Sequence, residues 1–476
     1  NQMRVLIVGC GLAGLATAIG LVTKMGGGPR ATDDDDEDKG QEGSSSVRVI
    51  HEIVIMEKRE NLESRGATFG LARNGQLSLE EIAPPSVLEA LKAMGILMPA
   101  TGGYMLPWWK VRDTLLETVQ GTSPYKEIIK IQLGCVIEKI ENLDNEEKPL
   151  RVSFAPSNSS LASVLLEEPQ EFDLLIGADG VHSQVRTEIL GLSPPVPSDT
   201  VVWRGSVDTN VVTELQHCQQ YPPGKYYAFR PDIVVAFFNF QARLPGIVAW
   251  IFSCQNAAQR KIVPGITTPL DILKDYRATL SAEQEAEEAA NLEDAMRLME
   301  NTIHPSELTW STEMAVVDLD EFTSSTGENK NDNSRDHRWG GRGRVTIIGD
   351  AAHSIRPASG LGGSLAFEDA AVLTRALLQD NDSSSGGVSL SVPQRLAQFE
   401  AQRLPRCRSI SRDQTLRSTL AYKVGFMKVP AWDPAYAEWV WEGPNASPNP
   451  PVDERQVFEP ILQELESKEE QKSSRE

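Results

Sequence analysis

The sequence has little cysteine. Its 476 residues include five cysteines, and none of them forms a C-x-x-C pair or another metal-ligand spacing, so we expect no metal site. A small, scattered and odd-numbered set indicates reduced thiols in a reducing compartment rather than a disulfide-bonded scaffold. The sequence also lacks an uninterrupted run of about 18 apolar residues, so we expect no membrane span.

Positive charge is scarce as well. The chain carries 46 Lys and Arg against 67 Asp and Glu, a net charge of −21. Nucleic-acid binding needs a basic face, so this balance argues against a nucleic-acid partner. The chain begins almost directly before a predicted strand, which leaves no room for a targeting peptide within it, and we expect a cytoplasmic location.

The first chemical signal is a glycine-rich segment near the N-terminus. Residues Met3–Val8 are mostly apolar, which is typical of a buried strand, and apolar residues then recur at helical spacing from Leu12. Between them, Gly9, Gly11 and Gly14 form a G-x-G-x-x-G pattern. In that pattern the glycines allow a tight turn, a close approach of the backbone to a pyrophosphate, and packing of the helix on the strand. The segment therefore predicts a dinucleotide-binding loop.

An acidic residue follows at the end of the next predicted strand, His51–Arg59. Residues 26–46 are rich in Gly, Ser and Asp, so we interpret them as a disordered surface insertion, with an acidic interaction loop as the alternative. Without this insertion Glu57 lies near the usual distance, roughly 20 residues beyond the glycines, where an acid accepts hydrogen bonds from a ribose. An acid there repels a 2′-phosphate, which disfavours NADP in this site.

Three segments together resemble the single-component FAD-dependent aromatic hydroxylases, the class A flavoprotein monooxygenases typified by para-hydroxybenzoate and salicylate hydroxylases. They are the glycine loop with Glu57 and its continuation to residue 75, "DLLIGADGVHSQVR" (173–186), and "GDAAHSIRPASGLGGSLAFEDA" (349–370). The resemblance implies an α/β fold: a Rossmann-type FAD-binding domain with a mostly parallel sheet, an inserted antiparallel substrate-binding sheet, and C-terminal helices. It implies FAD as the cofactor and NADPH or NADH as the electron donor.

The third segment suits the flavin end of FAD. Asp350 ends a strand, where its carboxylate can accept hydrogen bonds from the ribityl hydroxyls, and Pro357 offers a rigid wall without an N–H group. Gly362 and Gly363 let backbone N–H groups approach the ring, and the helix that follows points its positive end at a reduced flavin. The family commonly carries Gln or Lys where Leu361 stands, and often Asn or Gly at the position of Ser364.

The resemblance also implies cofactor contacts outside the third segment. Asp179 makes a turn near the pyrophosphate with the glycine that follows it, and Arg186 has two readings, a phosphate ligand or a salt bridge at a helix start. Gly70, at the end of "GATFG", aligns with a backbone contact to FAD. Arg112, at the start of a predicted helix, corresponds to an arginine beside the ribityl and phosphate groups.

The catalytic candidates lie in the middle of the chain. Arg204, in "VVWRGS", occupies a position where some relatives of this family place a catalytic arginine over the flavin, and packing at a domain boundary is the alternative. Tyr227 is a candidate to hold or deprotonate a substrate hydroxyl, although periodicity does not separate it from Tyr226. We interpret His353 as a structural residue satisfied within its own turn.

The chain divides by pattern into four parts. Residues 1–200 with 340–425 form the predicted FAD-binding domain, and 201–324 form a middle substrate domain of short strands, with a charged helix at about 281–299. Residues 325–343 read as a loose insertion. Residues 426–476 hold an aromatic segment, a candidate lid, dimer contact, membrane contact or packing element, followed by a tail that we expect to be partly disordered.

The resemblance implies a monooxygenase that uses NAD(P)H and O2 to hydroxylate or epoxidise a small organic, most often aromatic, substrate through a flavin C4a-hydroperoxide, acting as a monomer or homodimer. One alternative is a flavin reductase or halogenase of the same fold, although "PWWKV" does not reproduce the W-x-W-x-I-P pattern of halogenases. Another is a flavin-binding protein that no longer turns over and acts through interactions.

Overall fold

The computed structural model describes residues 2–25, 49–62, 68–99, 101–145, 147–156, 168–208, 224–230, 232–255, 257–263, 266–280, 286–300, 310–320, 339, 341–356, 360–378, 390–424, 429–453 and 455–473. The predicted insertion at 26–46 lies outside these residues, as does nearly all of the predicted insertion at 325–343.

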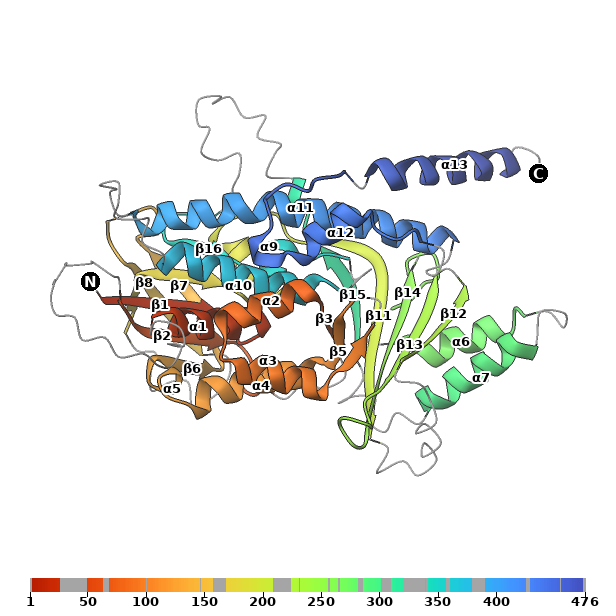
Figure 1. The fold of residues 1–476 in the computed structure, drawn as a ribbon, viewed down its shortest axis with the longest axis horizontal. Helices are drawn as coiled ribbons and strands as arrows, with labels where there is room; N and C mark the ends of the chain where they lie inside the picture. Colours follow the sequence, from red (N-terminus) through yellow and green to blue (C-terminus); the bar gives the residue numbers. More distant parts are fainter. Residues whose placement is uncertain are drawn as a thin grey trace, which may run out of the picture.

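A five-stranded parallel sheet forms one half of the molecule (Figure 1). Its order is β16-β10-β1-β2-β6, and every neighbouring pair is parallel. The central strands are short apolar runs buried on both faces, as parallel sheets require. The strands are β1 (Gln2–Val8), β2 (Val49–Glu57), β6 (Ile129–Leu133), β10 (Leu174–Gly177) and β16 (Val345–Ile347).

The two helices that follow glycine-rich turns pack together beside this sheet. Helix α1 (Leu12–Met25) is buried from Leu12 through Val22, so it is an interior helix rather than an amphipathic surface one. Helix α10 (Gly362–Leu378) lies against it, and a Cβ added to Gly20 would come within 2.7 Å of Thr374 Oγ1. The first and third motifs are thereby held side by side.

Smaller elements surround this core. Helix α2 (Arg73–Ile82) packs on α10, and α4 (Trp108–Gly121) packs on α1. Two three-stranded antiparallel sheets and two short helices complete this half: β3 (Thr68–Leu71), β4 (Ile96–Met98), β5 (Gly103–Pro107), β7 (Cys135–Glu141), β8 (Leu150–Pro156), β9 (Gln170–Phe172), α3 (Pro85–Met94) and α5 (Tyr125–Ile128).

A five-stranded antiparallel sheet forms the other half, as the sequence predicts. Its order is β12-β13-β14-β11-β15, and Figure 1 shows β11 at the border with the first half. Helices α6 (Pro269–Arg277) and α7 (Ala286–Glu300) pack on its outer face. The strands are β11 (Val196–Asp208), β12 (Gly224–Arg230), β13 (Ile233–Asn239), β14 (Ile247–Gln255) and β15 (Trp310–Val316).

The C-terminal part is helical. After the short α9 (Asp350–His353), the long α11 (Val392–Val424) runs along the molecule and α12 (Pro434–Trp441) packs beside it (Figure 1). The tail predicted to be partly disordered contains α13 (Arg455–Ser473), a helix that the sequence analysis does not predict. Phe458 and Leu462, one helical turn apart, pack on Leu420 of α11 and hold the start of this helix.

Two predictions from the composition, on cysteines and on membrane spans, can be compared with the structure. Cys10, Cys135, Cys254 and Cys407 are free thiols in buried positions, whereas Cys218 lies outside the described residues. Among the residues that the structure describes, no helix is both long enough and apolar enough to cross a membrane.

Candidate functional site

The glycine loop touches the second motif directly. Gly9 follows β1 with a φ of +111°, a conformation that favours glycine, and its N–H donates to the carbonyl of Met56 at 2.6 Å. A Cβ on Gly9 would lie 2.3 Å from the carbonyl oxygen of Ala178, at the end of the adjacent strand. The first glycine is therefore needed because two strand ends meet at this point.

The other two glycines have opposite surroundings. A Cβ on Gly14 would lie 2.2 Å from the carbonyl oxygen of Gly9, so this position closes the packing of α1 on β1. A Cβ on Gly11 would meet nothing within 4 Å. Space is therefore open at the N-terminus of α1, where unpaired N–H groups favour a phosphate. The arrangement fits the pyrophosphate of a dinucleotide.

Glu57 lies beside the loop, at the end of β2. Its Oε2 accepts a hydrogen bond from the N–H of Cys10 at 3.1 Å, and its Oε1 accepts one from the N–H of Arg59 at 3.0 Å. Each carboxylate oxygen keeps a second lone pair for a further donor. This position suits the ribose contact predicted for Glu57.

Arg112 is the positive charge on this side of the loop. It is buried in α4, donates to Asp113 at 2.8 Å, and lies over the ring of Trp108. Burial and the charge of Glu57 raise the pKa of Cys10 to about 12, and the charge of Arg112 partly opposes them. The charges of Arg112 on α4 and Glu57 on β2 therefore both influence the glycine loop, and the thiol of Cys10 stays neutral.

The second motif uses its acid internally. The Asp179 carboxylate accepts hydrogen bonds from the Ser183 hydroxyl and from the N–H groups of Gln184 at 2.7 Å and Val185 at 3.2 Å, which caps a single helical turn at Val185–Ile189. Burial raises the pKa of Asp179 and these bonds partly offset it. Gly180 has a φ of +80° and open space beside it. The second motif therefore borders this open space with the backbone of Gly180 rather than with the Asp179 carboxylate.

Arg186 connects the second motif to the third. It is 1% exposed and donates to the carbonyls of Ser193 at 2.7 Å and Ala351 at 3.5 Å. These two contacts join the segment after the second motif to the turn after Asp350. The phosphate ligand and the salt bridge at a helix start both stay predictions.

The third motif presents Asp350 beside the start of α10. Its side chain is open to solvent, but the surrounding protein raises its pKa through desolvation, against the charges of His353 and Arg204. A Cβ on Gly362 would lie 4.0 Å from Asp350 Oδ1. Gly363 has a packing role, because a Cβ there would overlap the ring of Phe69 at 2.0 Å. Pro357 lies outside the described residues.

Gly70 adjoins the third motif. A Cβ on Gly70 would lie 3.2 Å from the carbonyl oxygen of Gly360. Ser364 Oγ donates to the carbonyl of Gly70 at 3.1 Å and accepts from the N–H of Ala72 at 3.0 Å. Ser364, which departs from the family pattern, therefore joins the two loops predicted to contact FAD.

His353 is structural, but its partner lies on another helix. Its Nε2 is 2.6 Å from Asp369 Oδ2, and that oxygen also accepts the N–H of Gly349 at 2.8 Å. Burial opposes charge on both side chains, but their mutual attraction raises the pKa of His353 and, with Arg403, lowers that of Asp369. The pair holds the turn that carries Asp350.

A neighbouring carboxylate completes this buried network, which sequence reasoning missed. Glu368 accepts from Arg403 at 2.6 Å, from Arg406 at 2.7 and 2.8 Å, and from Asn74 at 2.7 Å. Burial opposes its charge, but Arg406 and Arg403 outweigh this and lower the pKa of Glu368 to about 2. The available signal was an adjacent Glu-Asp pair within the otherwise apolar stretch Leu365–Leu373.

One group of side chains in this network has the composition of a metal site. Ligand atoms of His353, Asp369 and Cys407 lie within 4.8 Å of one another. Arg403 Nε, however, donates to Asp369 Oδ1 at 2.7 Å and places a positive charge against the group. We therefore interpret it as part of the hydrogen-bond network.

The register of the antiparallel sheet separates the catalytic candidates. Arg204 pairs with Ile251, Ile251 with Ala236, and Ala236 with Tyr226. Directly paired residues share a face, so these positions form one row, and Ala236 and Ile251 belong to the cluster that includes Met105 of β5.

The adjacent row faces the opposite way. Trp203, Phe252 and Val235 pack with residues of α6 and α7, and Tyr227 pairs with Val235. Backbone register therefore places position 227 in the outer row and position 226 in the row of Arg204. Arg204 also attracts Asp350, while burial lowers its pKa.

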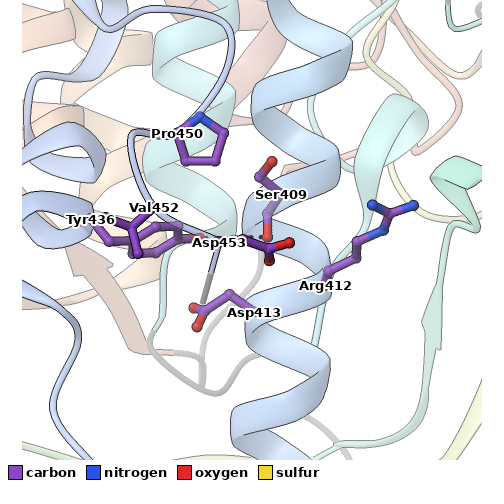
Figure 2. A pocket seen from close by; sticks show the side chains of 7 residues that line it. All are labelled: Ser409, Arg412, Asp413, Tyr436, Pro450, Val452 and Asp453. Carbon is purple, nitrogen blue, oxygen red and sulfur yellow. Dashed lines mark hydrogen bonds between the residues drawn. The ribbon is translucent and has the colours of Figure 1, made fainter. Parts of the chain in front are cut away.

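A separate cavity of about 140 Å³ lies between α11 and the C-terminal segment (Figure 2). Asp413 in its wall accepts hydrogen bonds from Arg417, Gln414 and Trp432, each at 2.9 Å. The cavity is lined by Ser409, Arg412, Asp413, Tyr436, Pro450, Val452 and Asp453. None of these residues belongs to the three motifs.

The fold and these strand ends define an FAD-binding oxidoreductase. The chain belongs to the FAD binding domain family, which matches residues 167–413, just over half of its length. It is an FAD-dependent monooxygenase, the class to which its curated relatives belong. The resemblance inferred from the three motifs is thereby confirmed.

Two relatives show the range of similarity. The FAD-dependent monooxygenase atmM of Aspergillus flavus is 26% identical over 385 residues, which cover 79% of this chain and 74% of atmM. Salicylate hydroxylase of Pseudomonas putida is 29% identical over 259 residues, which cover 52% of each chain.

Solved structures confirm the fold. CtdE in complex with FAD and a substrate matches with a TM-score of 0.63 and 16% identity, over 98% of both chains. HpxO of Klebsiella pneumoniae, complexed with FAD and uric acid, matches with a TM-score of 0.57 and 17% identity, over 98% of this chain and 97% of HpxO. At these identities the likeness establishes the architecture alone.

Proposed function

We propose that this monooxygenase takes electrons from NADPH or NADH and uses O2 to hydroxylate an aromatic or heteroaromatic substrate held between the antiparallel sheet and the third motif. The observation that carries the proposal is the pair of hydrogen bonds that link Ser354 in the third motif to the end of β15, the strand that pairs with β11. The attraction between Arg204 of β11 and Asp350 supports the same placement of the substrate sheet. Relatives named for salicylate, urate and kynurenine support this substrate class.

The residues that hold FAD fall into three groups. Glu57 accepts from the adenosine ribose, the loop at Gly11 and Gly180 receives the pyrophosphate, and Asp350 accepts from the ribityl chain. When bound and reduced, FAD supplies the electrons that activate O2 for insertion of one oxygen atom into the substrate. The contribution of the protein is orientation, exclusion of water and proton handling.

Arg204 and position 226 serve the substrate in this proposal. The Arg204 guanidinium, partly buried beside Asp350, stabilises negative charge that develops on a substrate oxygen. Backbone pairing puts position 226 in the row of Arg204, which supports Tyr226 over the predicted Tyr227. We propose Tyr226 as the hydrogen-bond partner for a substrate hydroxyl. The free buried thiols agree with a reducing, cytoplasmic setting.

The experiment is NADPH and NADH oxidation by the purified holoenzyme in air, with O2 uptake and products followed across phenols, aromatic acids and purines. The proposal predicts that one of these classes stimulates O2 uptake and yields a product one oxygen heavier. A holoenzyme whose FAD is never reduced by either nicotinamide would instead be a flavin-binding protein without turnover. Reduction without oxygen incorporation would indicate a reductase.

A further inference from the structure

Arg356 is a half-buried cation that makes no hydrogen bond and no ion pair with the described part of the chain. Its Nε atom is inaccessible to solvent and lacks an acceptor. The buried arginines Arg112, Arg403 and Arg406 all donate to carboxylates. A guanidinium removed from water without an acceptor is unfavourable, so the position of Arg356 needs another explanation.

The segment that carries Arg356 is fixed on the substrate sheet. Ser354 Oγ donates to the carbonyl of Ala315 at 2.9 Å, and the N–H of Val317 donates to the carbonyl of Ser354 at 2.9 Å. Both contacts are at the end of β15, the strand that pairs with β11. Arg356 therefore lies at the point where the third motif joins the antiparallel sheet.

Opposite this junction, β11 is interrupted. Its register with β15 shifts between Pro197 and Val201, and the buried Ser198 Oγ in that interruption has no hydrogen-bond partner in the described structure. Arg356 is attracted to Asp199, but the two make no ion pair, and Asp199 Oδ1 accepts the N–H of Ala258 at 2.9 Å. The charge of Arg356 is therefore not neutralised by direct contact.

The same segment borders the flavin loop. A Cβ on Gly362 would lie 3.9 Å from Ile355 Cγ1 and 4.0 Å from Asp350 Oδ1, so residues on both sides of α9 line the start of α10. The positive end of α10 and the charge of Arg356, one residue beyond Ile355, both favour an anion in this region. Arg356 offers several N–H donors in the planar arrangement that suits a carboxylate.

We propose that Arg356 binds an anionic group of the substrate, a carboxylate or an ionised hydroxyl on an aromatic ring, and so selects anionic over neutral aromatics. The inference rests on the proposed function, since it places the substrate between the third motif and the antiparallel sheet. In this proposal Arg356 recognises the charge that the substrate already carries when it binds. Arg204 stabilises the charge that develops on the substrate during the reaction.

The test compares anionic and neutral probes on the holoenzyme. Salicylate, 4-hydroxybenzoate, urate and the neutral salicylamide are titrated into wild type, Arg356→Gln and Arg356→Lys, with binding followed by the visible spectrum of bound FAD and by calorimetry. We expect wild type to bind at least one anion more tightly than salicylamide. Arg356→Gln weakens the binding of that anion by about tenfold or more, the scale expected when a hydrogen bond to a charged group is lost, and Arg356→Lys weakens it by less.

Controls separate this role from a loss of folding. FAD content stays unchanged in both variants, and salicylamide binding does too. Arg277→Gln, which removes an exposed arginine paired with Glu293 on the outer helices of the same sheet, leaves anion binding unchanged.

Three results would overturn the proposal. The first is a wild type that binds none of the anions, and the second is an Arg356→Gln variant that binds the anions and salicylamide more weakly to the same extent. The third is an Arg356→Gln variant with a lowered flavin midpoint potential and unchanged anion binding. The last result would assign the charge of Arg356 to the flavin. Anion binding that depends on Arg356 in an enzyme that consumes no O2 would instead leave this inference intact and refute the proposed function.

Discussion

Arg204 of β11 and Asp350 at the start of α9 attract each other across the boundary between the antiparallel sheet and the FAD-binding loops. Desolvation by the surrounding protein lowers the pKa of Arg204 and raises that of Asp350, and each charge partly offsets the effect of desolvation on the other. In the proposed function Asp350 accepts hydrogen bonds from the ribityl chain, so this relationship supports a role for Arg204 beside the flavin.

Replacement of that cation separates catalysis from cofactor binding. We expect Arg204→Ala to retain FAD while product formation slows by about 100-fold or more, the scale found when a positioned donor to developing charge is removed. FAD content by absorbance and product formation by chromatography measure the two effects. Arg277→Ala, at an exposed pair with Glu293, is the control in the same half of the molecule. Turnover equal to that of wild type would remove Arg204 from the site.

Gly11 and Gly14 give opposite expectations for the same substitution. Gly11→Ala adds a methyl group to open space, so the apoprotein should unfold as wild type does, while FAD binding weakens by about tenfold or more through contact with the pyrophosphate. Gly14→Ala places its Cβ against the carbonyl of Gly9 and should destabilise the fold by about 1–3 kcal/mol.

The measurements are thermal unfolding of the apoproteins and FAD titration by fluorescence. Gly121→Ala, at the end of α4 with nothing within 4 Å of the added Cβ, serves as control. Tight FAD binding by Gly11→Ala would show that the open space is not the cofactor site.

We expect the negative charge of Glu57 to strengthen FAD binding. In Glu57→Gln a neutral acceptor replaces the carboxylate beside the glycine loop, and FAD affinity should fall by about tenfold, since hydrogen bonds to charged acceptors are the stronger ones. Fluorescence titration of the apoprotein measures this, with Glu60→Gln at an exposed position as control. The ribose contact would be refuted if both variants bound FAD as tightly as wild type.

Glu368 predicts a specific loss of stability in acid. Its pKa is lowered from 4.5 to about 2, so its charge stabilises the fold above pH 4.5 and that contribution, about 3 kcal/mol, disappears as the pH falls toward 2. In Glu368→Gln this acid dependence is reduced. The variant should also be less stable at neutral pH by about 3–5 kcal/mol, because Arg403 and Arg406 lose a carboxylate partner.

Denaturant unfolding between pH 2 and pH 7 checks this account. Glu141→Gln, at an exposed pair with Lys139, should follow the wild-type curve. Parallel curves for Glu368→Gln and wild type across the acid range would contradict the assignment.

The sequence predicted those parts of the site that depend on local pattern. The loop at Gly9, the acid at Glu57 and the turn at Asp350 each follow an apolar strand, and parallel strands place such turns at one edge of a sheet. The alternation along β12 could not decide between Tyr226 and Tyr227, because the choice depends on pairing with β13.

Other features depend on contacts between distant segments. Nothing adjacent to His353 in the sequence identifies Asp369 as its partner, and Glu368 finds Arg406 only after α10 and α11 pack. The helix after residue 454 was missed because proline-rich residues precede it and Pro460 lies within it, although Phe458 and Leu462 have helical spacing.

The most direct test of the central claim is an experimental structure of the protein with FAD. The account predicts one extended FAD, with its ribose at Glu57, its pyrophosphate beside Gly11 and Gly180, and its ribityl chain at Asp350. FAD bound away from these strand ends, for example in the cavity lined by Ser409 and Asp453, or a protein that takes up no FAD, would contradict it.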